Sequence, residues 1–184
     1  QTETAVQQKV FKFGNGTADA DKSFKSLLGG KGANLAEMSS IGLPVPPGFT
    51  ISTTCCAYYS DNNAAWPDGL EADVRAGIEH LENTIGAKFG DADNPLLVSV
   101  RSGAAVSMPG MMDTVLNLGL NDDAVKGLAA NFGNERFAYD SYRRFIDMFG
   151  AVVMGISHDH FEDAIDDLKS ERGVANDTDL TAAD

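Results

Sequence analysis

Apolar and polar positions follow two different periods along the chain, and these predict both strands and helices. Short apolar runs around residues 10–13, 49–51 and 96–101 have the length and the flanking Gly or Pro residues of strands. Residues 70–85 carry an apolar stripe at the three- and four-residue spacing of an amphipathic helix. From Asn121 onward the whole pattern is helical. The chain is therefore predicted to mix helices with short strands.

The order of these elements predicts how the chain is organised. We expect an α+β fold with a flexible tail over residues 1–9 and an α/β part over 10–117. A helical subdomain over 118–184 follows, with helices near 122–132, near 135–149 and after Ser157. Residues 177–181 read as the start of one more helix, so we expect the chain to be truncated at this end, as a fragment of something larger.

Composition and charge exclude several classes of function. The chain has 14 Lys and Arg residues against 27 Asp and Glu residues, a formal net charge of −13. Such an acidic balance argues against a nucleic-acid binder or a protein of anionic membranes, both of which need a basic surface. No apolar run approaches the roughly 18 residues that a membrane span requires. The two cysteines, Cys55 and Cys56, are adjacent and favour free thiols in a reducing, intracellular compartment.

The first candidate for chemistry is the sequence Leu-Gly-Gly-Lys-Gly-Ala-Asn-Leu at residues 28–35. Glycines just before a helix let backbone N–H groups face one point, where the helix N-terminus favours a phosphate. Lys31 adds a mobile ammonium group for phosphate oxygens. The pattern is neither a P-loop nor a dinucleotide-binding fingerprint, because the glycine spacing differs from both. A flexible loop with a solvated lysine is the alternative interpretation.

The second candidate covers residues 99–114, where Arg101 ends an apolar strand and a loop rich in Gly, Ser and Met follows. A guanidinium group at the end of a strand is well placed to bind phosphate, and Gly110 would let the loop close over a ligand. Ser107 and Thr114 offer hydroxyl groups for the same ligand. The alternative is that one of the many carboxylates neutralises Arg101. Exposed methionines in the loop nevertheless favour a lid that packs on something.

The third candidate is the segment 136–145, which carries aromatic residues at helical spacing and the pair Arg143 and Arg144. Such aromatics usually belong to a core, and such arginines usually pair with acids three or four positions away, here Asp140 or Asp147. One arginine facing a cleft is the other interpretation. No nucleophile with a base and no metal-ligand spacing is evident, so no metal site is predicted.

Taken together, these motifs resemble the N-terminal nucleotide-binding region of the pyruvate, phosphate dikinase family. The resemblance extends over nearly the whole chain from about Val10. Its most specific part is the Met-Pro-Gly-Met-Met-Asp-Thr sequence at residues 108–114, which differs from the corresponding loop of phosphoenolpyruvate synthase. The segments that carry the resemblance are residues 29–38, 46–50, 99–119, 136–145 and 177–181.

The resemblance implies a partial ATP-grasp-type domain that binds ATP or AMP and inorganic phosphate or diphosphate. The family interconverts ATP, pyruvate and phosphate with AMP, phosphoenolpyruvate and diphosphate, through a phosphohistidine on a swivelling domain. By motif position Lys31 and Arg101 match the family's triphosphate-contacting pair, and Arg144 matches an arginine near the phosphate site. The expected nucleotide-binding set is Lys31, Arg101, Ser107, Gly110, Asp113, Thr114 and Arg144, with Lys31 and Arg101 as the catalytic pair.

Other parts implied by the resemblance are absent from the sequence. The phosphohistidine motif, the Mg²⁺ ligands for Mg-ATP and the pyruvate-binding barrel are expected outside this chain, so we expect the chain alone not to turn over. The full-length phosphotransferase is expected to be a homodimer in the cytoplasm or the plastid stroma, with no nucleic-acid or membrane partner. A synthase-like dikinase and a non-catalytic nucleotide-binding module remain as alternatives.

Overall fold

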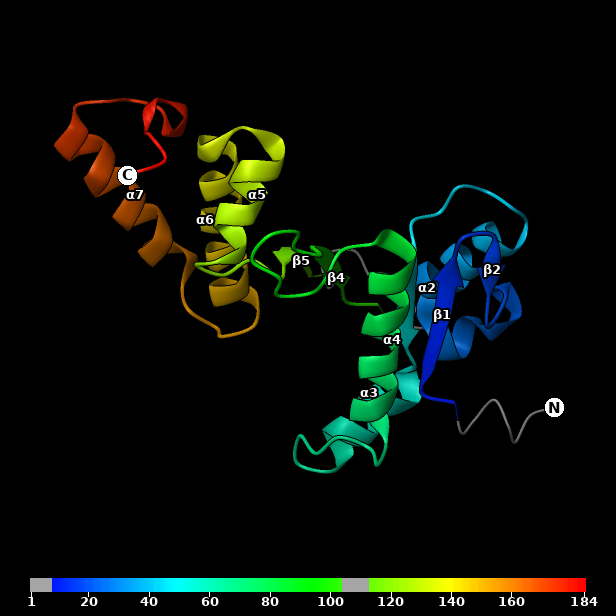
Figure 1. The fold of residues 1–184 in the computed structure, drawn as a ribbon. Helices are drawn as coiled ribbons and strands as arrows, with labels where there is room; N and C mark the ends of the chain where they lie inside the picture. Colours follow the sequence, from blue (N-terminus) through cyan, green and yellow to red (C-terminus); the bar gives the residue numbers. More distant parts are fainter. Residues whose placement is uncertain (1–7, 104–112) are drawn as a thin grey trace. The chain divides into compact units, whose positions relative to one another are not determined.

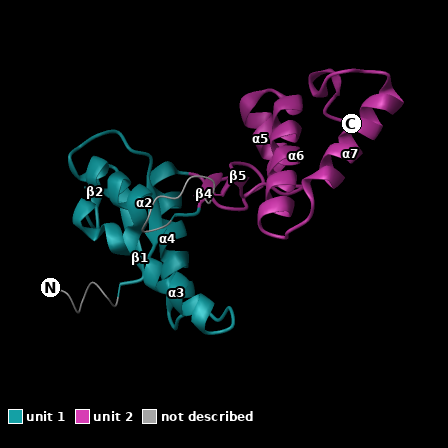
Figure 2. Ribbon diagram, turned by 180° about the vertical axis from the view of Figure 1, so that it is seen from behind, with its two compact units in different colours: residues 1–86, 102–112 teal, residues 87–101, 113–184 magenta. Residues whose placement is uncertain are grey.

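A computed structural model describes residues 8–103 and 113–184 of the chain. These residues form helices and two small sheets, so the mixed α+β class predicted from the sequence is confirmed (Figure 1). It divides into two compact units, shown in different colours in Figure 2. Unit 1 comprises residues 1–86 and 102–112, and unit 2 comprises residues 87–101 and 113–184. The division into domains at residue 117 stays a prediction.

Unit 1 is built on an antiparallel three-stranded sheet with the order β2-β1-β3. The register pairs Phe11 with Thr50 and Phe13 with Ala18. The elements are β1 (Val10–Gly14), β2 (Thr17–Ala18), η1 (Lys22–Phe24), α2 (Lys25–Ser40), β3 (Gly48–Ile51), α3 (Thr53–Asp61) and α4 (Leu70–Ile85).

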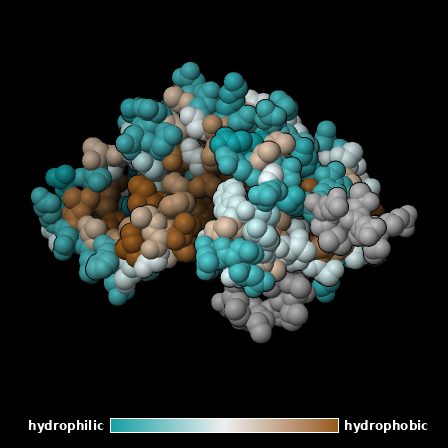
Figure 3. Space-filling model, turned by 90° about the horizontal axis from the view of Figure 1, so that it is seen from below, coloured by the Kyte–Doolittle hydropathy of each residue, from teal (hydrophilic) through white to brown (hydrophobic). Residues whose placement is uncertain are grey.

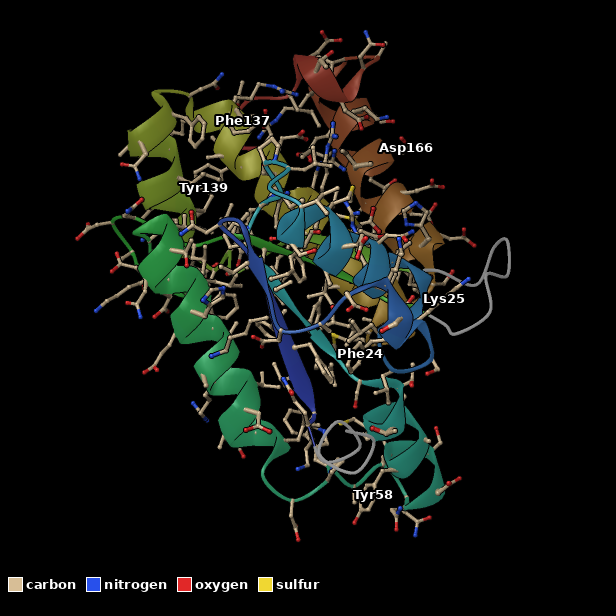
Figure 4. The ribbon with its side chains drawn as sticks, turned by 90° about the vertical axis from the view of Figure 1, so that its right-hand side faces the viewer. Phe24, Lys25, Tyr58, Phe137, Tyr139 and Asp166 are labelled. Carbon is tan, nitrogen blue, oxygen red and sulfur yellow. The ribbon has the colours of Figure 1, made fainter. Side chains whose placement is uncertain are left out.

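The alternation of side chains along β1 gives unit 1 two cores. Phe11 packs with Leu28 and with alanines of α2, and its ring centroid lies 6.1 Å from that of Phe24, which is labelled in Figure 4. Val10 points to the other face and packs with Cys55 of α3 and Leu70 of α4. Successive residues of a strand face opposite sides, so one short strand holds a helix on each face of the sheet.

Close approach of the helices to the sheet depends on two glycines. A Cβ atom on Gly77 of α4 would lie 2.7 Å from the ring of Phe49. A Cβ atom on Gly32 of α2 would lie 2.9 Å from Cγ2 of Thr50. Since real Cβ atoms do not come this close to other atoms, any larger residue would push either helix off the sheet.

The buried hydroxyl group of Ser39 fastens the end of α2 to the turn between β1 and β2. Ser39 is 0% exposed, and its Oγ accepts a hydrogen bond from the backbone N–H of Gly14 at 2.9 Å. The same hydroxyl donates to the backbone carbonyl of Thr17 at 2.7 Å. One side chain therefore satisfies two backbone groups that the tight turn leaves unpaired.

Helix α2 begins earlier than the sequence pattern predicts. The glycine-rich segment was expected to precede a helix, whereas helical structure already starts at Lys25. Within the helix the backbone departs from helical angles only at Gly29, with φ 69° and ψ 173°. Only Gly adopts a positive φ without strain, so this residue makes a kink that divides α2 into two helical segments.

Unit 2 combines a two-stranded antiparallel sheet with helices packed on it. Its core is centred on α5 and α6, where Val125 and Ala138 are buried. The helix expected to start at residue 177 is a short 3₁₀ turn closed by a capping box between Asn176 and Asp179. The elements are β4 (Val98–Arg101), β5 (Thr114–Leu118), α5 (Ala124–Phe132), α6 (Glu135–Val152), α7 (His158–Arg172) and η2 (Asp177–Asp179).

None of the residues of α7 is fully buried, and the helix meets α6 through the ring of Phe161, which lies against Gly150, and through the contact of His158 with Asp147. Charged groups link it further to its own neighbours and to the end of the chain. The ammonium group of Lys169 lies 2.7 Å from a carboxylate oxygen of Asp166, which Figure 4 labels, and 3.0 Å from one of Asp177. Arg172 lies 2.6 Å from Asp184. Figure 3 shows hydrophobic side chains at the surface of the molecule. Among the exposed large apolar residues of unit 2 are Val153 and Met154, which follow the end of α6.

Replacing Ser39 by Ala should lower the free energy of unfolding by about 1–3 kcal/mol, because two buried backbone groups lose their partner. Ser40 is the matched control, since its hydroxyl is exposed and donates only to the Glu37 carbonyl within the same helix. Denaturant unfolding of the Ser39→Ala and Ser40→Ala variants measures the difference. Equal losses of stability in both variants would contradict the role of Ser39.

Replacing Asp177 by Asn should destabilise unit 2 most near neutral pH. The hydrogen bond from Lys169, with smaller contributions from Arg143 and Arg144, lowers the pKa of Asp177 from its ordinary value of 3.8. A lowered folded-state pKa adds stability above the unfolded value, and this stability is lost as the pH falls through the folded pKa. The difference in Tm between wild type and Asp177→Asn should therefore shrink between about pH 7 and about pH 3.

Asp167 provides the control for this pH series, because it lies exposed on α7 and has no ion pair among the described residues. Asp167→Asn should change Tm little over the same range. A Tm difference for Asp177→Asn that stays constant with pH would show that the charge of Asp177 is not involved.

Candidate functional site

The kink at Gly29 places Lys31 in the first turn of the second helical segment of α2. Its side chain is half-buried, and no carboxylate among the described residues lies within ion-pair distance of its ammonium group. A Cβ atom on the neighbouring Gly30 would meet only the tip of Lys25, so this side of the turn is open. A cation with no partner at the start of a helix is a favourable arrangement for binding phosphate.

The position of Lys31 also depends on the packing beneath it. Gly32 lies against Thr50 of β3, so the turn that carries Lys31 is pressed onto the edge of the sheet. Ser39 fixes the other end of the same helix. The lysine therefore extends from a backbone that is held at both ends.

In unit 2 the hairpin of β4 and β5 brings Arg101 and Thr114 together. The two residues are direct cross-strand partners at the end of the ladder. Directly opposed residues of an antiparallel pair project to the same face of the sheet, so the guanidinium and the hydroxyl group point to one side. An irregularity between Val98 and Val100 shifts the register and contributes to this alignment.

Arg101 is exposed, and no carboxylate among the described residues lies within ion-pair distance of its guanidinium group. The sequence had left open whether a carboxylate neutralises it, and the described part of the chain contains none that does. Asp113, next to Thr114, is exposed as well and interacts with another group. Ser107 and Gly110, the other loop residues predicted to contact a ligand, lie outside the described residues.

Arg144 lies on α6 and shares the carboxylate of Asp140 with Arg143. Arg143 donates to one oxygen from Nε at 3.1 Å and from a terminal nitrogen at 2.9 Å. The Nε atom of Arg144 lies 3.0 Å from the other oxygen. The predicted pairing of these arginines with Asp140 is thus confirmed. The side chain of Arg144 is still 65% exposed, so its guanidinium can also meet an anion from solution.

The predicted site residues therefore fall into separate groups within the two units. Lys31 belongs to unit 1, whereas Arg101, Asp113, Thr114 and Arg144 belong to unit 2. Of these, the structure brings Arg101 and Thr114 into direct register.

Sequence reasoning missed one arginine with a clear structural task. Arg136 donates to the backbone carbonyls of Leu180 at 2.9 Å and Asp177 at 2.8 Å, and so holds the end of the chain against α6. These contacts join residues 44 and 41 positions apart, so no local spacing rule could have found them. The only available signal was an arginine within a helix whose aromatic residues face the core.

The described residues do not form a metal site. No group of three or more His, Cys, Asp or Glu side chains in residues 8–103 and 113–184 is arranged to hold a metal ion. Asp113 and the acidic residues of α7 therefore offer no cage for Mg²⁺ in this part of the chain.

Among the described residues, no helix has the length and apolar character needed to cross a membrane.

Comparison with known proteins places these features in a family. Residues 25–71 and 64–165 match the sequence profile described as "Pyruvate phosphate dikinase, AMP/ATP-binding domain". Chloroplastic pyruvate, phosphate dikinase of Flaveria trinervia is 59% identical over 181 residues, which are 98% of this chain and 19% of that protein. The chloroplastic pyruvate, phosphate dikinase 1 of Arabidopsis thaliana is 61% identical over 179 residues, 97% of this chain and 18% of that protein.

A relative whose name does not mention the chloroplast has a similar sequence identity to this chain. Pyruvate, phosphate dikinase 2 of Oryza sativa subsp. japonica is 62% identical over 180 residues, which are 98% of this chain and 20% of that protein. The chain thus spans about a fifth of the length of the curated relatives that it matches. Because the profile covers well over half of the chain and includes Lys31, Arg101 and Arg144, the chain belongs to the family of the pyruvate phosphate dikinase AMP/ATP-binding domain.

Proposed function

We propose that this chain is the ATP-binding part of a pyruvate, phosphate dikinase. Such an enzyme interconverts ATP, pyruvate and phosphate with AMP, phosphoenolpyruvate and diphosphate. The observation that carries the proposal is an identity of about 60% over 98% of the chain, a range that takes in both Lys31 and Arg101. Both cations lack a carboxylate partner in the described part of the chain, which supports a role in holding an anionic ligand.

The roles that we propose for the individual residues follow from the chemistry of phosphoryl transfer. Catalysis of this reaction is mostly positioning and stabilisation of charge on phosphate oxygens, so cations and hydrogen-bond donors matter more than a nucleophile. Lys31 and Arg101 would hold the triphosphate, and Thr114 would donate from the strand opposite Arg101. Ser107, Gly110 and Asp113 would form the loop over the phosphates. Arg144 would bind inorganic phosphate with its exposed guanidinium.

Other parts of the reaction belong to other segments of the longer protein. We expect Mg²⁺ to reach the site with ATP and to neutralise phosphate charge there, held by ligands outside this chain. The phosphohistidine and the pyruvate site are likewise expected in further domains, so the chain alone should not form phosphoenolpyruvate. We expect the full-length enzyme to be a homodimer in the plastid stroma or the cytoplasm, the former because several relatives are named chloroplastic.

Two alternatives are distinguished by direct measurements on the full-length protein. A phosphoenolpyruvate synthase-like enzyme uses water in place of phosphate, so a strict requirement for phosphate would exclude it. A non-catalytic nucleotide-binding module would bind Mg-ATP without transferring a phosphoryl group, so Mg-ATP binding in a calorimetric titration without phosphorylation of the protein would favour it. Both phosphate-binding candidates, Lys31 and Arg101, are present and have no carboxylate partner among the described residues, which supports the dikinase over a module that has lost this chemistry.

Replacing Arg101 by Ala in the full-length protein should slow phosphorylation of the enzyme by ATP by about a hundredfold or more, since one charge-stabilising donor is lost. The half-reaction between pyruvate and the phosphorylated enzyme should keep nearly its full rate, because it occurs at another site. Rapid-quench measurement of each half-reaction with labelled ATP and labelled phosphoenolpyruvate tests this expectation.

Arg75 provides the control for this experiment, because it is an exposed arginine of α4 that pairs with Glu71 at 2.7 Å. Arg75→Ala should leave both half-reactions unchanged. Equal loss of both half-reactions in Arg101→Ala would argue against a role in ATP binding and for a general loss of structure.

A further inference from the structure

The side chain of Lys25 ends at the turn from which Lys31 extends, although the two lysines lie on opposite sides of the kink in α2. Its Cε atom is 3.9 Å from the position that a Cβ atom on Gly30 would take. Gly30 directly precedes Lys31 in the sequence. The end of the Lys25 side chain, labelled in Figure 4, therefore lies over the backbone beside Lys31.

The kink at Gly29 makes this contact possible. Successive residues of an α-helix are about 100° apart around the axis, so residues five positions apart differ by roughly 140° and do not share a face. Lys25 and Gly30 are five positions apart, yet the end of the lysine lies against the glycine. The reason is that the backbone leaves helical angles at Gly29, with φ 69° and ψ 173°. The kink thus brings a second lysine to the glycine turn.

The residues on either side of Lys25 are anchored, so its backbone has a defined position. Phe24 packs against the core of unit 1, with its ring centroid 6.1 Å from that of Phe11. The backbone carbonyl of Ser26 accepts a hydrogen bond from the hydroxyl group of Thr53, at the start of α3, at 2.7 Å. The flexible side chain of Lys25 can therefore adjust to a ligand while its backbone stays in place.

We infer that Lys25 is a second lysine of the proposed nucleotide site and binds phosphate oxygens of the nucleotide together with Lys31. The inference rests on the proposed function, which places phosphate groups at this turn. The lack of a carboxylate partner among the described residues is not distinctive, since Lys9 and Lys88 share it. The position of the side-chain end carries the inference, because it lies at the start of a helical segment, where backbone N–H groups also favour an anion.

Two lysines at one turn suit a polyphosphate better than a single phosphate group. Like charges repel each other when the site is empty, and a bound anion removes this cost. A triphosphate carries several negative charges and offers oxygens on successive phosphorus atoms, so it can bridge two ammonium groups. Lys25 is exposed and Lys31 is half-buried, so Lys25 can turn toward a ligand with little loss of packing. Its role is to bind and position the nucleotide.

The test is single-turnover phosphorylation of the full-length protein by labelled ATP over a range of ATP concentrations. Lys25→Gln should raise the ATP concentration for the half-maximal rate about tenfold, because one charged contact with the phosphates is lost. The half-reaction with labelled phosphoenolpyruvate should keep its rate. Lys25→Arg should restore most of the affinity, because it retains the charge. Lys22→Gln, at an exposed lysine that pairs with Glu37 at 3.3 Å, should change neither half-reaction.

Inhibition by inorganic tripolyphosphate, which has neither base nor sugar, identifies the part of the nucleotide that Lys25 contacts. Lys25→Gln should weaken this inhibition by the same factor as it weakens the affinity for ATP. A loss confined to ATP would overturn the assignment of Lys25 to the phosphates. Equal weakening of ATP binding in Lys25→Gln and Lys25→Arg would contradict a contact made through charge.

A parallel Lys31→Gln variant separates this inference from the proposed function. If Lys31→Gln weakens ATP binding and Lys25→Gln leaves it unchanged, Lys25 has no part in the site and the inference is wrong, while the proposed site stands. If neither variant changes phosphorylation by ATP, the glycine turn does not bind the nucleotide, and the proposed role of Lys31 fails together with that of Lys25.

Discussion

Both faces of the small sheet in unit 1 must be covered by helices, and the structure of the unit depends on how closely these helices can approach the sheet. Three short strands expose apolar side chains on both sides, and α2 and α4 cover them. Gly32 and Gly77 allow that approach, because a Cβ atom at either position would overlap a β3 side chain. The contact of Gly32 with Thr50 also positions Lys31, so the packing of α2 and the proposed binding of phosphate depend on the same close approach.

Local patterns predicted much of the fold, and long-range contacts account for most of what they missed. The apolar stripe of α4 and the run that becomes β4 were evident from spacing alone. The kink at Gly29 was not, because the residues before it also form helix and spacing cannot show a break inside a helical pattern. For the candidate site, residue type and motif position singled out Lys31 and Arg101. The contacts of Arg136 with residues 177 and 180 depend on tertiary structure, which no spacing rule contains.

The structure shows which of the chain's few cations pair with its many carboxylates. Many of its cations pair with carboxylates, as Arg143 and Lys169 do, and these contacts are used to hold helices in place. Lys31, Arg101 and Lys12 have no such partner within the described part of the chain. Lys9, Lys25 and Lys88 also have no carboxylate partner among the described residues, so the lack of a partner supports a binding role only together with the position of Lys31 after the glycine kink and of Arg101 at the end of β4.

The lack of fully buried residues in α7 implies that this helix opens more easily than the core of unit 2. A helix without fully buried residues gains less from the hydrophobic effect than the α5–α6 core does, although Phe161 packs against Gly150. Its opening free energy should lie well below that of the α5–α6 core, so its amides should exchange with solvent while that core stays folded. Because salt screens exposed ion pairs, we expect a higher ionic strength to weaken the pairs of Lys169 with Asp177 and Arg172 with Asp184 and so to ease this opening slightly. Unit 2 thus contains one segment whose order depends on the surrounding electrolyte.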